Sequence, residues 1–263
     1  METQLLIIDP QVDFCDPSGA LFVQGADADM ERLAGFVSAH GAGLAGIHVT
    51  LDTHHKRDIA HPLWWRNATG AHPTPFTIIS VEDVESERWI PADPTQAERS
   101  LAYVYALAAN GRYPLCIWPE HCLIGSTGHA VYPVLFDALG EWERISGESI
   151  AFWRKGENPL TEHYSVLRAD VPDPDDPSTL PNIALIDALR SADRILVAGE
   201  AGSHCVASTL RDLDTLAPEL TRRLVLLTDT VSPVTGFEAL QESFLNDLTP
   251  RGMRLSTTKE MAL

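Results

Sequence analysis

Short, wholly apolar runs that alternate with helical patterns constrain the fold of this chain more than any other feature. Runs such as Leu5–Ile8 and Ile195–Ala198 lack the polar alternation of a half-exposed strand, so we expect both faces of these strands to be buried. Strands and helices that alternate at this spacing build a parallel sheet covered by helices and joined by right-handed crossovers. We therefore predict an α/β fold, a three-layer α/β/α sandwich around a six-stranded, mainly parallel sheet.

The predicted elements follow from these patterns. Strands are expected at residues 4–9, 43–51, 150–154, 194–199, 223–229 and 253–257, and helices near 26–40, 95–110, 130–142, 182–191, 205–215 and 237–248. A chain of 263 residues suits one large domain, and we expect residues 1–263 to form it. Residues 62–113 are rich in proline and tryptophan and too long for a plain connection, so they are expected to be an insertion that forms a lid or an oligomer contact.

The composition limits the possible binding partners of the protein and its cellular compartment. A formal net charge of −18 argues against binding to nucleic acid or to an anionic membrane. Four scattered cysteines are too few for a disulfide framework, and no apolar stretch reaches the ~20 residues of a membrane span. The N-terminus carries no signal-like run. We expect a cytoplasmic protein with free thiols and a small-molecule partner.

Three chemically active side chains lie at the ends of predicted strands. Asp9 follows the first strand, Lys155 ends another, and Cys205 begins a helix after the turn that starts at Gly199. Because the carboxyl ends of parallel strands meet at one edge of the sheet, these three groups are expected to be neighbours. A helix N-terminus and an ammonium both lower the pKa of a thiol, and a carboxylate can act as general base and then as general acid. The sequence therefore predicts a cysteine nucleophile site.

A second group of side chains has the donor types of a metal site. Asp52 and His54 follow another strand end, and residues two apart on an extended segment point to the same side. His121 lies on the proline-stiffened turn Trp118–Cys122. Histidine and carboxylate ligands suit zinc, iron or manganese. The neighbouring His55, Asp58, His61 and His72 are further candidates.

Five segments, in this order, resemble the nicotinamidase branch of the isochorismatase-like cysteine hydrolases. They are DPQVDF (9–14), DTH (52–54), WPEHC (118–122), RKG (154–156) and GEAGSHCVAS (199–208). The resemblance covers almost the whole chain and departs from the family in the enlarged stretch between His61 and Tyr113. It implies the isochorismatase-like hydrolase fold and a homo-oligomer.

The resemblance also implies roles for individual residues. Asp9, Lys155 and Cys205 match the catalytic triad, and Asp52, His54 and His121 match the ligands of one divalent metal ion, with zinc as the first choice and iron or manganese as alternatives. His61 is the candidate for a further ligand, with Asp58 or His72 as alternatives. The remaining matches are the oxyanion-hole N–H groups of Ala201 and Cys205, a cis Glu200–Ala201 peptide bond, and the aromatic rings of Phe14 and Trp118, which hold the ring of the substrate.

The function implied is hydrolysis of a small aromatic carboxamide, nicotinamide first, to the acid and ammonia through a thioester. Hydrolysis of another amide or of a ureido acid on the same fold is the nearest alternative. A catalytically inert binding protein of the same fold is the alternative from another class, and the reactivity of Cys205 would separate it from an enzyme. An isochorismatase is disfavoured, because vinyl-ether hydrolysis needs neither the thiol nor the metal site.

Overall fold

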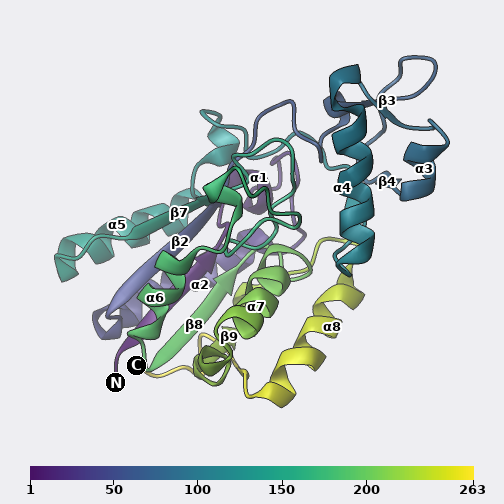
Figure 1. The fold of residues 1–263 in the computed structure, drawn as a ribbon. Coiled ribbons are helices and arrows are strands. Elements are labelled where there is room, and N and C mark those ends of the chain that lie inside the picture. The colour runs from purple at the N-terminus through teal and green to yellow at the C-terminus, as the bar shows by residue number, and fades with distance from the viewer.

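The computed structural model describes all 263 residues and has a six-stranded parallel sheet at its centre. The strands lie in the order β10-β9-β8-β1-β2-β7 (Figure 1). Their bounds are β1 Thr3–Ile8, β2 Gly46–Asp52, β7 Ala151–Lys155, β8 Arg194–Gly199, β9 Leu224–Leu227 and β10 Arg254–Ser256. The prediction of a six-stranded parallel sheet is confirmed.

Helices cover both faces of this sheet, as the apolar strands require. The chain crosses from β1 to β2 in one direction and from β8 to β9 in the other, so right-handed crossovers place α2 and α5 on one face and α6, α7 and α8 on the opposite face (Figure 1). The helices of the two layers are α2 Ala26–His40, α5 Pro133–Ser146, α6 Ile183–Arg190, α7 Cys205–Leu216 and α8 Glu238–Leu248. No helix combines the length and hydrophobicity needed to cross a bilayer.

Element boundaries differ from the predicted ones where short turns replace strand or helix. β2 begins at Gly46, because Gly41–Gly43 form a 3-10 turn instead of the first residues of the strand. β9 ends at Leu227, because Thr228–Thr230 form another such turn. The helix expected from residue 130 begins at Pro133, which suits the first helical turn because its missing N–H has no partner there in any case.

The carboxyl ends of the central strands form one crevice. The chain leaves β1 and β8, which are neighbours, toward opposite edges of the sheet, and such a switch point is where ligands bind in open α/β sheets. The register pairs Ile8 with Gly199 and Asp52 with Lys155. Residues that follow β1, β2, β7 and β8 are therefore brought to the same edge.

The turn after β8 depends on a glycine. Gly199 has a φ of +107°, and a Cβ atom at this position would lie 2.0 Å from the carbonyl oxygen of Ile8. A side chain would thus be excluded both by the backbone conformation and by the neighbouring strand. Gly199 lets the chain turn sharply out of the sheet toward Cys205, the first residue of α7.

Residues 62–113 add no strand to the central sheet. The helices and strands of this segment are β3 Trp65–Arg66, β4 Ile78–Ile79, α3 Val81–Glu85, β5 Ile90–Pro91 and α4 Ala97–Ala109, and they gather beyond one end of the sheet (Figure 1). β3 pairs with β5, and β4 pairs with β6 (Leu115–Cys116). The buried indole of Trp64 donates a hydrogen bond to Ser100 Oγ (3.1 Å) inside the segment, and that of Trp65 donates to the carbonyl of Ile59 (2.7 Å), just before it.

Candidate active site

The amine of Lys155 joins the three groups predicted to form a nucleophile site. Its Nζ lies 3.0 Å from Asp9 Oδ2, 3.0 Å from Asp52 Oδ1 and 3.6 Å from Cys205 Sγ. Asp9 is the residue directly after β1. Its backbone N–H donates a hydrogen bond to Thr50 Oγ1 (3.0 Å), and its Oδ1 accepts a hydrogen bond from the same hydroxyl. The structure thus brings Asp9, Lys155 and Cys205 together at the crevice.

Burial dominates the ionisation of the thiol. It raises the pKa of Cys205 well above the usual range, and the nearby Lys155 cation does not compensate. This differs from the expectation that the helix start and Lys155 would lower the pKa, because burial, together with the charges of Asp9 and Asp52, outweighs the effect of Lys155. Burial also raises the pKa of Asp9, against the opposing effect of Lys155. The site therefore holds a neutral thiol beside a carboxylate of increased basicity.

Two backbone donors face the same space as the thiol. The N–H groups of Ala201 and Cys205 donate to no acceptor, whereas those of His204 and Val206 both donate to the carbonyl of Ala201. The Glu200–Ala201 peptide bond is cis, as the resemblance implied. Ala201 and Cys205 both line the pocket described below. Unpaired N–H groups at a helix start are suited to hold a developing oxyanion.

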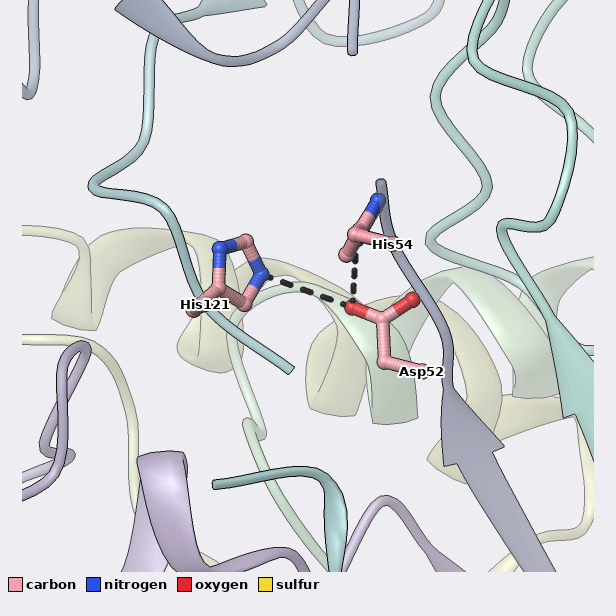
Figure 2. A group of neighbouring side chains, drawn as sticks. All are labelled: Asp52, His54 and His121. Carbon is pink, nitrogen blue, oxygen red and sulfur yellow. Dashed lines mark ion pairs between the residues drawn. The ribbon is translucent and has the colours of Figure 1, made fainter. Parts of the chain in front are cut away.

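Asp52, His54 and His121 converge on one point next to the triad (Figure 2). Their candidate ligand atoms lie within 4.8 Å of one another, and all three residues are buried. Asp52 Oδ2 is 3.1 Å from His54 Nε2 and 3.5 Å from His121 Nε2. Burial raises the pKa of Asp52, but His54 and Lys155 outweigh this effect and hold the pKa of the carboxyl well below its usual range.

The hydrogen bonds of the two histidines leave both Nε2 atoms directed toward Asp52. His54 Nδ1 bonds to Asp58 Oδ2 (3.1 Å), and His121 Nδ1 bonds to the carbonyl of Pro119 (2.8 Å). Both Nδ1 atoms are bonded to acceptors, so the Nε2 atoms are the ones available to a metal ion. Asp52 and Asp58 outweigh burial and raise the pKa of His54 well above its usual range, so a metal ion would displace the proton that this ring shares with Asp52. His54 Nε2 is buried and has no hydrogen-bond partner. Two imidazole nitrogens and a carboxylate oxygen that converge in a buried position are the donor types zinc prefers, so the residues present fit a divalent metal of the zinc type.

The further-ligand candidates differ in their placement. His61 Nε2 lies 3.4 Å from His121 Nδ1, on the side of that ring away from Asp52, and burial lowers the pKa of His61 to about 2. Asp58 uses both carboxylate oxygens, on His54 and on the N–H of Ala60 (3.0 Å), and so orients the ring of His54. His72 is exposed and bonds to the carbonyl of Trp65 (2.6 Å), outside the cluster.

An aromatic pocket opens onto the thiol and the candidate metal site. Phe14 and Trp118 line it together with Asp52, His121 and Cys205, and it is partly open to solvent. Trp118 is fixed by its indole N–H, which donates to Tyr164 Oη (2.9 Å). The pocket therefore offers two aromatic walls and a small, largely apolar interior, which suits a small planar ligand.

Other residues of the site were not found from the sequence. The side-chain amide of Gln11 donates to the carbonyl of Asp52 (2.8 Å) and accepts from its N–H (2.7 Å), so it locks Asp52 next to β1. Gln11 lies inside the DPQVDF segment, which was the available signal. Glu162 and Tyr164 line the pocket from an irregular loop whose sequence has no periodicity to indicate them. His204 lines it too, and burial lowers its pKa to about 3, which fits a packing role.

Part of this chain is similar in sequence to a curated protein. The chain is 28% identical to the nicotinamidase of Escherichia coli (strain K12) over 132 residues, which span 49% of this chain and 54% of that protein. The chain thus matches about half the length of this curated relative. A scan against models of protein families found no match.

Solved structures match over nearly the whole chain. An isochorismatase-like hydrolase from Alkaliphilus metalliredigens is 16% identical with a TM-score of 0.55, covering 98% of this chain and 96% of that chain. A protein from L. infantum in complex with nicotinate is 20% identical with a TM-score of 0.61, covering 98% and 93% of the two chains. A pyrazinamidase of Pyrococcus horikoshii in complex with zinc is 19% identical with a TM-score of 0.56, covering 98% and 99%.

The sheet order and these matches define the class of the protein: it has the fold of the isochorismatase-like hydrolases. Within that class, its similarities are to nicotinamidases and pyrazinamidases. The predicted fold class is confirmed.

Proposed function

We propose that this protein is a cysteine amidohydrolase that converts a small aromatic carboxamide, nicotinamide first, to the carboxylate and ammonia. The observation that carries the proposal is the contact of one amine, Lys155 Nζ, with both Asp9 and Cys205 beside an aromatic pocket. The nicotinamidase relative and the nicotinate-bound neighbour support the substrate class.

The first half of the reaction uses the neutral thiol. Cys205 gives its proton to Asp9 while the sulfur attacks the amide carbon, and the oxyanion that forms accepts hydrogen bonds from the N–H groups of Ala201 and Cys205. Removal of one such donor typically costs about 2.7–4 kcal/mol of transition-state stabilisation. Asp9 then returns its proton to the leaving nitrogen, which departs as ammonia and leaves a thioester.

The second half releases the acid. Water attacks the thioester carbon while Asp9 takes its proton, and the same two N–H groups hold the second oxyanion. The carbon–sulfur bond then breaks, and Asp9 returns the proton to the sulfur of Cys205. Lys155 stays charged throughout, since Asp52 and Asp9 outweigh its burial and raise the pKa of its amine well above the usual range.

The proposed cofactor is one divalent metal ion held by Asp52, His54 and His121, with His61 as the candidate for a further ligand. When bound there, the ion supplies a Lewis-acidic position that can hold a ring nitrogen of the substrate. Zinc is the first choice, because two histidines and a carboxylate suit it and a pyrazinamidase neighbour was solved with zinc.

A graded loss of metal is expected from changes in this cluster. His54→Ala should lower zinc affinity by more than ~100-fold, because it removes a ligand atom. Asp58→Ala should lower it by about 10–100-fold, because it removes the group that orients His54. The bound metal is measured by elemental analysis after dialysis, and the zinc affinity by competition with a chelator.

His55→Ala is the matched control, because His55 is adjacent in sequence but exposed. Its zinc content should equal that of the wild type. Full zinc occupancy in His54→Ala would show that the ligand set is wrong, and equal affinities of wild type and Asp58→Ala would remove the orienting role of Asp58.

A substrate screen tests the function itself. Purified protein is assayed for ammonia release from pyridine-3-carboxamide, pyrazine-2-carboxamide, benzamide and several ureido acids, with and without chelator. We expect the ring carboxamides that contain nitrogen to be turned over, benzamide to be much poorer, and the chelator to reduce activity. Turnover of ureido acids alone would favour the alternative substrate, and no turnover of any compound would favour the inert binding protein.

We also propose that residues 1–263 form a single domain in which 62–113 is an insertion that shapes the pocket. The support is the contact of Tyr103 in α4, whose hydroxyl accepts the N–H of the pocket residue Glu162 (3.0 Å).

A further inference from the structure

Glu162 is a buried carboxyl group in the pocket that the proposed reaction does not use. It lines the same space as Cys205 and Trp118, and the residue is 4% exposed. Its Oε1 accepts the N–H of His163 (2.9 Å), whereas Oε2 is buried without any hydrogen-bond partner. Among the charged groups around it, His54 lowers the pKa of Glu162, whereas the carboxylates Asp52 and Asp58 raise it. One oxygen of a carboxyl group that belongs to a pocket-lining residue is therefore left unsatisfied.

The backbone holds this side chain firmly in place. The N–H of Glu162 donates to the hydroxyl of Tyr103 (3.0 Å), which is itself buried in α4. The carbonyl of Glu162 accepts the N–H of Asp170 (2.9 Å). These two bonds fix the backbone of Glu162, and the hydrogen bond from the N–H of His163 to Oε1 fixes its carboxyl group. The fold therefore fixes the position of Glu162.

The surroundings determine which form of the carboxyl is present. An ionised carboxylate that is buried without a full set of donors is costly. Burial accordingly raises the pKa of Glu162 to about 8. Since Oε1 already accepts a hydrogen bond, the proton of the neutral acid belongs on Oε2. The pocket thus presents an O–H donor, and a buried donor gains from an acceptor on the ligand.

We propose that Glu162 is a specificity-determining residue whose Oε2 donates a hydrogen bond to an acceptor atom on the aromatic ring of the substrate. This inference rests on the proposed function, since it takes the ring to lie between Phe14 and Trp118. The carboxamide oxygen and the metal-facing ring nitrogen are already assigned to other groups. The substrate class is therefore an aromatic carboxamide whose ring carries a second acceptor, such as a second nitrogen in place of a CH.

Four isosteric compounds test this in a scan around the ring. Pyridazine-3-, pyrazine-2-, pyrimidine-5- and pyridazine-4-carboxamide each replace a different CH of pyridine-3-carboxamide with nitrogen. For each compound, kcat/KM is divided by that of pyridine-3-carboxamide, in wild type and in Glu162→Met. Because intrinsic reactivity is the same for both proteins, the change in this ratio reports the contact with Glu162.

We expect the ratio for one of the four compounds to fall about tenfold in Glu162→Met, the loss typical of one buried hydrogen bond to a neutral partner. Glu162→Gln should keep most of the preference, because its amide can still donate. The matched control is Glu157→Met, which makes the same change in the same loop outside the pocket and should leave all four ratios unchanged. Glu162→Ala replaces Glu162→Met if thermal melting shows that the latter does not fold.

The outcomes separate this inference from the proposed function. If wild type hydrolyses pyridine-3-carboxamide and all four ratios stay within about twofold in the Glu162 variants, the inference is overturned and the function stands. If Glu162→Gln loses the preference as fully as Glu162→Met, the group acts as an acceptor and the proposed donor role is wrong. If wild type hydrolyses no ring carboxamide, the proposed function fails and this inference fails with it.

Discussion

Cys205→Ala is expected to lower kcat by about 10⁴-fold or more, because no other nucleophile can replace the sulfur. Sγ lies 3.6 Å from Lys155 Nζ at the start of α7, and Cys205 lines the aromatic pocket. Loss of the side chain leaves the backbone N–H groups and the pocket in place, so the variant should still bind the carboxamide. Ammonia release gives the rate, and calorimetry with the carboxamide gives the affinity.

The matched control for this prediction is Cys116→Ala. Cys116 is also a buried free cysteine, but it lies in β6 and does not line the pocket that holds Cys205. Its kcat should stay within a few-fold of wild type. Intact-protein mass spectrometry of wild type mixed rapidly with substrate should detect the acyl adduct, and a digest should place it on Cys205. Ammonia release near the wild-type rate in Cys205→Ala would remove this residue from the mechanism.

The chemistry of the free thiol also differs from what the helix start suggested. The sequence places Cys205 at a helix N-terminus beside a lysine, and both features favour the thiolate. Burial was not visible at that stage, and it is the larger effect, since it raises the pKa of Cys205 well above the usual range. The proton must therefore leave the sulfur as the reaction proceeds, which makes the neighbouring carboxylate more important than a preformed thiolate would.

The fold was predictable because it follows from local patterns. Short apolar runs without alternation favour buried strands. Strand ends in a parallel sheet meet at one edge, so Asp9, Asp52, Lys155 and Cys205 could be placed together from their sequence positions. The exact ends of the elements were less predictable. β2 starts three residues later than expected, because a 3-10 turn at Gly41–Gly43 satisfies the same apolar pattern.

The polar partners of the site were not predictable, because they depend on contacts between distant segments. Asp58 bonds to His54 Nδ1 from four residues away, yet nothing in the sequence separated this orienting role from that of a ligand. Glu162 is held by Tyr103, 59 residues earlier in the chain. The pairing of Glu162 with Tyr103 depends on how the segment 62–113 packs on the loop after β7, and neither piece has the periodicity from which packing could be inferred.

Asp9→Asn is expected to be nearly as damaging as loss of the nucleophile, with kcat lower by at least ~10³-fold, because both proton transfers pass through this carboxylate. The change is isosteric, and the amide oxygen that it introduces can still accept the hydroxyl of Thr50, so the fold should be retained. Asp137→Asn, an exposed position on α5, is the matched control and should keep wild-type activity.

In wild type, kcat/KM should fall as the pH is lowered through the raised pKa of Asp9, since the protonated carboxyl cannot accept the proton of Cys205.

An activated ester separates the catalytic role of Asp9 from a merely structural one. The nitrophenyl ester of pyridine-3-carboxylic acid has a leaving group that needs no proton, so Asp9→Asn should recover part of the acylation rate with this compound. The thioester must still be hydrolysed by water that Asp9 would activate, so acyl-enzyme should accumulate in the variant and be visible by mass spectrometry. A variant that turns over the ester without accumulation would exclude Asp9 as the base for hydrolysis. Equal loss on amide and ester, with no adduct, would instead show that Asp9 only holds Lys155 in place, because a misplaced ammonium would impair attack on both substrates alike.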